Sequence, residues 1–132
     1  MSTQDNVKTI QGFYEAFGRG DVQHILDGLT DNVHWYSHFT SEVPWGGDFS
    51  GKANVPGFFS AIYGNVDVNL FSPDEFVSEG NTVISMGRFG ATSKTTGKTD
   101  ETPWIFIWKF DGDKVCSYEQ YSKPTFGQIF VA

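Results

Sequence analysis

Aromatic side chains occupy every second position of residues 104–110, and this alternation constrains the fold more than any other feature of the sequence. The aromatic residues are Trp104, Phe106, Trp108 and Phe110, with Ile105, Ile107 and Lys109 between them. Successive side chains of a β-strand point to opposite faces of a sheet, so one face is wholly aromatic and the other mostly aliphatic. Because an exposed aliphatic face would form an adhesive patch, both faces need cover. The alternation predicts helices over the aromatic face and a second subunit over the outer one.

The aromatic face has two interpretations. In the first, the rings only fill a close-packed core, which leaves no void larger than a water molecule. In the second, a curved sheet under short helices leaves an apolar cavity of a few hundred cubic ångströms, and such cavities with a few polar groups are the usual small-molecule sites. The alternation alone does not separate them.

Apolar periodicity predicts three helices in the first half of the chain. Residues 4–18 carry an apolar stripe at intervals of three and four: Val7, Ile10, Tyr14 and Phe17. Asp21 is a suitable N-cap for a second helix, whose apolar face is Val22, Ile25, Leu26 and Leu29 and which ends near residues 30–32. A third helix over about residues 54–63 begins at a capping Asn and has Pro56 in its first turn.

The remaining segments favour strands. Alternating or β-rich stretches at 33–39, 66–71, 76–77, 83–91, 102–110 and 114–121 are separated by turns at residues 80–81 and 111–113 and by loops at 41–51 and 92–100. Helices followed by a meander of strands indicate an α+β domain rather than βαβ units. With 132 residues, we expect residues 1–132 to form a single domain.

Composition excludes several classes of partner. The formal net charge of −7 disfavours nucleic acid and anionic membrane surfaces as partners. A single cysteine, Cys116, allows no internal disulfide and no cysteine-rich metal site. No apolar run approaches the ~20 residues of a membrane helix, and the polar N-terminus does not resemble a signal peptide. We therefore expect a cytoplasmic protein.

The histidines do not predict a metal site. His34 and His38 are four residues apart on a predicted strand, which separates them by about 13 Å, too far for one ion. Neither a phosphate-binding glycine loop nor a Cys/His dyad is visible in the sequence. We therefore predict no metal and no cofactor.

The order of elements resembles the nuclear transport factor 2-like superfamily, and within it the SnoaL-like, ketosteroid-isomerase-related proteins. The resemblance covers the chain to about Tyr121 and rests on these motifs: Phe13-Tyr14-Glu15-Ala16-Phe17, Gly20-Asp21, Leu29-Thr30-Asp31-Asn32-Val33, Gly51, Val55, Phe58-Phe59, Gly97-Lys98, Trp108-Lys109-Phe110 and Gly112-Asp113-Lys114-Val115. It implies a cone-shaped, curved, mainly antiparallel sheet that is wrapped around a pocket and covered by three N-terminal helices. It also implies a homodimer across the outer sheet face.

The same resemblance implies that the ketosteroid isomerase machinery is missing. Those enzymes use an Asp base and an oxyanion hole made of a Tyr and a protonated Asp. In this chain the base position falls on Ser37, the Tyr position on Phe13 and the protonated Asp position on Phe106; a further pocket Tyr falls on Phe59. Tyr14 is one position away, which would turn its side chain about 100° around the helix. We predict no ketosteroid isomerase activity.

These considerations define the candidate site. The candidate ligand-binding residues are Phe13, Trp35, Ser37, Phe59, Trp104, Phe106, Trp108, Tyr118 and Gln120. The catalytic candidates are His38 and Tyr14, and an acid of the 41–51 loop, Asp48 or Glu42, is the alternative to His38. The first hypothesis is an aromatic pocket for a small, largely apolar organic molecule; as an enzyme the protein would be a cofactor-independent isomerase, lyase, cyclase or hydrolase. The alternatives are a non-catalytic ligand-binding dimer and a protein-interaction module on the same scaffold.

Overall fold

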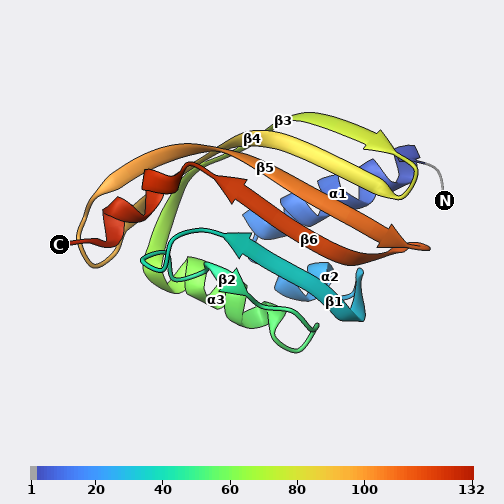
Figure 1. The fold of residues 1–132 in the computed structure, drawn as a ribbon, viewed down its shortest axis with the longest axis horizontal. Helices are drawn as coiled ribbons and strands as arrows, with labels where there is room; N and C mark the ends of the chain where they lie inside the picture. The colour runs from blue at the N-terminus through green and yellow to red at the C-terminus, as the bar shows by residue number, and fades with distance from the viewer. Residues whose placement is uncertain (1–2) are drawn as a thin grey trace.

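A curved six-stranded sheet forms one wall of the molecule, and three helices cover its concave face (Figure 1). The computed structural model describes residues 3–132. The elements in chain order are α1 (Thr3–Gly18), α2 (Val22–Leu26), β1 (Leu29–His38), β2 (Gly47–Asp48), α3 (Val55–Asn65), β3 (Val66–Glu79), β4 (Thr82–Ser93), β5 (Thr99–Asp111), β6 (Lys114–Ser122) and the 3₁₀ helix η1 (Pro124–Phe130). The predicted α+β class and helix-covered curved sheet are confirmed.

The sheet has the strand order β2-β1-β6-β5-β4-β3. β1 pairs with β6 in parallel, and the other neighbours are antiparallel. The register places Tyr118 of β6 between Trp35 of β1 and Trp108 of β5. Gln120 likewise lies between Ser37 and Phe106. The adjacent strands β1, β6 and β5 thus bring polar groups of β6 into a row flanked by aromatic rings.

The predicted alternation of β5 is confirmed. Its four aromatic residues are all at most 7% exposed, whereas Ile105 is 44% exposed and Lys109 is exposed. Ile107 is half-buried on the same outer face. The aromatic face packs under the helices because burial of this apolar area is the main stabilising contribution to such a fold.

The second helix is shorter than predicted. It ends at Leu26, and Leu29, which we expected on its apolar face, is instead the first residue of β1 and is buried against Val115. Gly28 lies in this early turn: its N–H donates to the carbonyl of Ile25, its carbonyl accepts from Val115 at 2.8 Å, and a Cβ there would lie too close to the Phe13 ring. The hydrophobic spacing was compatible with both structures, and pairing with β6 decided between them.

The strands also extend further than predicted. β3 is one continuous strand through the segment that we expected to be interrupted, with register shifts on both sides of residues 71–72. It tolerates Pro73 because it is the edge strand, where a missing backbone N–H leaves no partner unpaired. The predicted 92–100 loop is shortened to residues 94–98, since Thr92 pairs with Thr99. The short strand β2 and the helix η1 were not predicted.

Among the described residues, no helix has the length and apolar character needed to cross a bilayer. Figure 1 shows η1 at the end of the sheet opposite to the N-terminus. There Phe126 and Ile129 of η1 are buried, and the Thr96 hydroxyl hydrogen-bonds to the carbonyl of Ile129. The C-terminal segment therefore closes one end of the space beneath the sheet.

Candidate functional site

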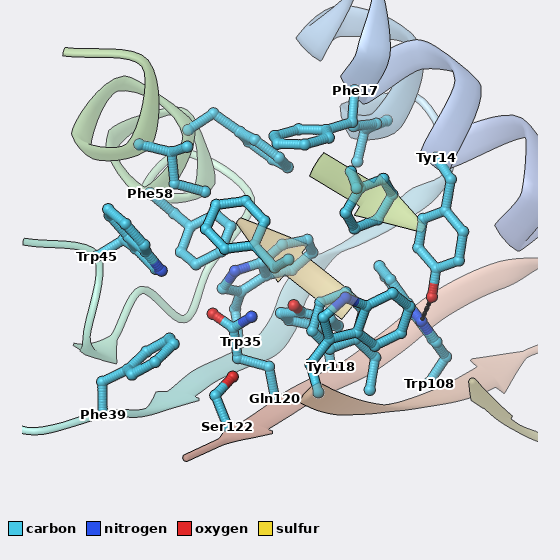
Figure 2. Close-up of a pocket in the computed structure, with 17 residues that line it drawn as sticks. Tyr14, Phe17, Trp35, Phe39, Trp45, Phe58, Trp108, Tyr118, Gln120 and Ser122 are labelled. Carbon is cyan, nitrogen blue, oxygen red and sulfur yellow. Dashed lines mark hydrogen bonds between the residues drawn. The ribbon is translucent and has the colours of Figure 1, made fainter. Parts of the chain in front are cut away.

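A cavity lies between the concave face of the sheet and the three helices (Figure 2). The helices contribute Tyr14, Phe17, Ile25, Phe58, Phe59 and Ile62. The strands and the loop before β2 contribute Trp35, Phe39, Trp45, Phe71, Phe89, Trp104, Phe106, Trp108, Tyr118, Gln120 and Ser122. A wall of this kind is the predicted aromatic pocket with a few polar groups.

The cavity is smaller than predicted. Its volume is about 60 Å³, against the expected few hundred. Aromatic rings fill much of the space between helices and sheet: Trp104 stacks on Phe106 at 3.9 Å between centroids, and Tyr118 contacts both Trp35 and Trp108 at 4.3 Å. One water needs roughly 10–15 Å³ of such volume, so the cavity holds the equivalent of about four to six waters. That space suits a small ring system rather than a steroid.

The cavity wall carries no ionisable acid, histidine, lysine or arginine among the described residues. Its polar groups are hydroxyl, amide and indole groups. Burial raises the pKa of both Tyr14 and Tyr118, so both phenols are protonated at neutral pH. The wall can donate hydrogen bonds, but it holds no base that would accept a proton at neutral pH.

Tyr14 connects α1 to the sheet through its hydroxyl group. Trp108 Nε1 donates to the Tyr14 oxygen at 2.9 Å, as the dashed line in Figure 2 shows. The same hydroxyl forms a hydrogen bond with Ser85 Oγ of β4, which has no exposed surface. Tyr14 is thus held by two buried partners on two strands.

Gln120 is held by Ser37 behind the cavity wall. Ser37 is fully buried, and its Oγ donates to Gln120 Oε1 at 2.5 Å. Ser37 itself does not line the cavity. The hydrogen bond orients the Gln120 amide, with its oxygen toward Ser37.

Two indole N–H groups of the wall have no partner. Trp35 Nε1 and Trp104 Nε1 are both buried and make no hydrogen bond with any described residue. Their side chains are 1% and 2% exposed. An unpaired buried donor costs about 1–3 kcal/mol, so two of them at one cavity are unusual.

Most of the predicted ligand-binding residues are brought together. Seven of the nine line the cavity: Trp35, Phe59, Trp104, Phe106, Trp108, Tyr118 and Gln120. Ser37 lies behind Gln120. The ninth, Phe13, does not line this cavity. Whether these residues bind a ligand stays a prediction.

Phe13 and Tyr14 have the reverse of their expected orientations. Phe13 is buried against Trp108 and His24, with ring centroids 5.7 and 6.4 Å away. Tyr14 lines the cavity beside Trp104 and Phe71. The expected orientation followed from aligning Phe13 with the isomerase Tyr, whereas the rotation of α1 against this sheet places the next residue toward the cavity.

His38, the other catalytic candidate, lies on the outer face of the sheet. Its Nε2 is 2.6 Å from Glu119 Oε1, and this hydrogen bond lowers the pKa of Glu119. Its ring stacks on Tyr121 at 4.2 Å. His34 Nε2 contacts the other oxygen of Glu119 at 3.4 Å. Because side chains on this face point away from the cavity, His38 is not placed to act on a molecule inside it.

Sequence analysis missed Trp45. It lies in the Pro/Gly-rich loop before β2, is 2% exposed and contacts Phe89 of β4 and Phe126 and Phe130 of η1. A loop residue has no periodicity to indicate which way it points. The only available signal was a tryptophan inside a turn-rich segment, since so large an apolar side chain is seldom left in water.

Comparison with known proteins agrees with this architecture. The SnoaL-like domain family matches residues 10–118. The crystal structure of a nuclear transport factor 2-like protein from Burkholderia xenovorans is 30% identical, with a TM-score of 0.83 over 93% of this chain and 92% of that one. TerC, co-crystallised with polyporic acid, is 23% identical with a TM-score of 0.84 over 97% and 99% of the two chains, a likeness in fold alone.

One curated relative matches part of the chain. Patulin synthesis protein F from Aspergillus clavatus is 32% identical over 90 residues, which is 65% of this chain and 44% of that protein. The chain therefore spans less than half the length of this relative.

A curved sheet, three covering helices and a cavity between them define a domain of the nuclear transport factor 2-like superfamily. Within that superfamily, the chain belongs to the SnoaL-like domain family.

Proposed function

We propose that the protein binds a small, planar, largely apolar organic molecule in the cavity beneath its sheet. The observation that carries the proposal is the cavity itself: a volume of about 60 Å³ lined by aromatic and aliphatic side chains and a few neutral polar groups. Small-molecule sites have this composition, although they are commonly larger. Rings of the wall would sandwich a flat ligand, since edge and face contacts between aromatics are favourable.

The relatives support a small-molecule role. TerC was crystallised with polyporic acid, another structure of the same fold is titled a putative SnoaL-like polyketide cyclase, and the fungal relative is named for patulin synthesis. These names describe the related proteins and not this chain. For this chain they favour an organic ligand over a macromolecular partner.

A catalytic role for the same cavity is the second candidate. The protonated phenol of Tyr118 favours it, because a buried phenol stabilises a developing negative charge by donating a hydrogen bond. Without a base on the wall, such a protein would assist a reaction in which the substrate supplies its own basic group. Turnover of a bound compound separates this candidate, a cofactor-independent isomerase, lyase, cyclase or hydrolase, from a non-catalytic binder.

Binding of indene, a planar hydrocarbon of two fused rings, tests the proposal. We expect saturable binding by isothermal titration calorimetry and an increase in melting temperature. Ser122→Phe, which places a ring at the cavity wall, should abolish binding. Ser60→Phe, on the exposed side of α3, is the matched control and should retain it. Equal binding by both variants, or none by the wild type, would refute the proposal.

We also propose a homodimer formed through the outer face of the sheet. Ile105 is 44% exposed and Tyr121 is 41% exposed on this face, with half-buried Ile107 beside Ile105. Tyr121 pairs with Ile105 across the strands, so the apolar surface is continuous. A second copy would remove it from water, which is the cover that the sequence pattern requires.

A further inference from the structure

We propose that the ligand of this cavity is a neutral, unsaturated compound with carbonyl-type acceptor oxygens, held by the indole N–H groups of Trp35 and Trp104 and the amide N–H groups of Gln120. This inference rests on the proposed function and specifies the chemistry of the same site. It follows from counting which hydrogen-bonding groups of the wall are already paired.

Two hydrogen-bond donors of the cavity wall remain unpaired within the described part of the chain. The Trp108 N–H is used by Tyr14, whose hydroxyl is also bonded to Ser85. The Trp35 and Trp104 N–H groups are buried without any partner among the described residues. An indole nitrogen only donates, so neither group can be satisfied by a ligand that lacks an acceptor.

Gln120 adds to this excess of donors. Its oxygen accepts from the buried Ser37 hydroxyl, so this side of the amide is occupied. Gln120 lines the cavity, and its hydrogen bond with Ser37 uses the oxygen and not the nitrogen of the amide. A primary amide nitrogen carries two donors and no acceptor.

The strand register places the three residues that carry these donors on adjacent strands. Gln120 and Ser122 are successive inward positions of β6. Trp104 of β5 pairs with Ser122, and Trp35 of β1 pairs with Tyr118 on the opposite side of β6. The three donor residues therefore come from three adjacent strands and all line the same cavity; Figure 2 labels Trp35 and Gln120 among them.

The electrostatics of the wall restrict the ligand further. No lysine, arginine, histidine, aspartate or glutamate of the described chain lines the cavity. A carboxylate or an ammonium ion would lose its hydration without gaining an opposite charge, which is costly in an apolar site. A neutral carbonyl, lactone or quinone oxygen would accept from the unpaired donors without this penalty.

Three bicyclic probes of nearly equal size test the inference: indene has no polar group, 1-indanone carries an acceptor oxygen and indole carries a donor N–H. We expect 1-indanone to bind at least about tenfold more tightly than indole, because it can satisfy the unpaired donors and indole cannot. Equal or tighter binding of indole would overturn the inference. If indole bound as tightly as 1-indanone and indene also bound, the inference would fail but the proposed function would stand. If none of the three probes bound, both the inference and the proposed function would be refuted.

Indole N–H resonances in ¹⁵N-labelled protein provide a second measurement that needs no variant. Relative to the indene complex, which accounts for ring-current effects, 1-indanone should shift the N–H signals of Trp35 or Trp104 downfield. The Trp108 signal is the internal control, since its N–H is already bonded to Tyr14. Unchanged Trp35 and Trp104 signals in a saturated 1-indanone complex would overturn the inference.

Trp104→Phe tests one donor directly. The affinity ratio of 1-indanone to indene should fall about two- to tenfold, the range expected for loss of one hydrogen bond. The ratio cancels the change in packing that both probes experience. An unchanged ratio in folded Trp104→Phe protein, together with an unchanged ratio in Trp35→Phe, would contradict the proposed role of these donors.

Discussion

Removing the hydroxyl group of Tyr14 should destabilise the protein far more than the loss of one oxygen atom suggests. In Tyr14→Phe, both Trp108 Nε1 and Ser85 Oγ lose a hydrogen-bond partner. The side chains of both residues are at most 3% exposed, so water does not readily replace the lost partner. Each buried group left unsatisfied costs about 1–3 kcal/mol, and the Ser85 hydroxyl can rotate. We therefore expect a total loss of about 2–4 kcal/mol.

Urea unfolding measures this loss. The free energy of unfolding is obtained by linear extrapolation, and an unchanged m-value would show that the unfolded state is the same. Tyr63→Phe is the matched control. It also removes one tyrosine hydroxyl, but that group donates at 2.7 Å to the carbonyl of Phe17 at a half-buried site, so we expect a loss of only about 0.5–1.5 kcal/mol.

A double variant identifies the cause. If Tyr14→Phe is destabilising because it leaves Ser85 unpaired, adding Ser85→Ala should restore part of the stability, about 1 kcal/mol. The reasoning would be refuted if Tyr14→Phe were no more destabilising than Tyr63→Phe. It would also be refuted if Ser85→Ala caused the same loss in both backgrounds.

Three further predictions address pH dependence, activity and assembly. Because burial raises the pKa of Tyr14 above its ordinary value of 10.0, the contribution of Tyr14 to the free energy of unfolding should be constant below about pH 10 and fall as the pH rises beyond it. Tyr14→Phe should flatten this decline in unfolding measurements from pH 9 to 12, and an equally steep decline in the variant would contradict the assignment. The protein should not isomerise a β,γ-unsaturated ketosteroid above the buffer rate, because Ser37 and Phe106 occupy the positions of the base and of one oxyanion donor, and the cavity wall holds no base; pocket-dependent turnover would show the opposite. Sedimentation should show a dimer at micromolar concentration that Ile107→Glu weakens by placing an unpaired charge in the interface, and a monomeric wild type would exclude this assembly.

Part of the candidate site was predictable because its signal is local. The aromatic alternation of β5 depends only on the period of a strand, which placed Trp104, Phe106 and Trp108 on one face before any tertiary contact was considered. Such patterns are strong when one face of a sheet is buried, since a slip of one residue would expose every apolar side chain. The inward positions Tyr118 and Gln120 of β6 were implied by the alignment with the resembling family.

Other parts of the site depended on packing between segments distant in the chain. Tyr14 and Phe13 are adjacent and both aromatic, and the helical stripe includes both. The rotation of α1 against β4 and β5 decided that Tyr14 faces the cavity and that Phe13 packs beside His24. Trp45 entered the wall through contacts with η1, an element without a recognisable sequence signal.

The sequence by itself determined the α+β class and the two-faced character of β5. Only the tertiary structure decided where β1 begins, which tyrosine reaches the cavity, and that ring packing reduces the cavity to about 60 Å³. The physical reason is the sequence separation over which each kind of interaction acts. Periodicity and turn chemistry act over a few residues along the chain, whereas register, helix rotation and unfilled volume arise from contacts such as Ser37 with Gln120 and Tyr14 with Ser85, which join segments far apart in the sequence.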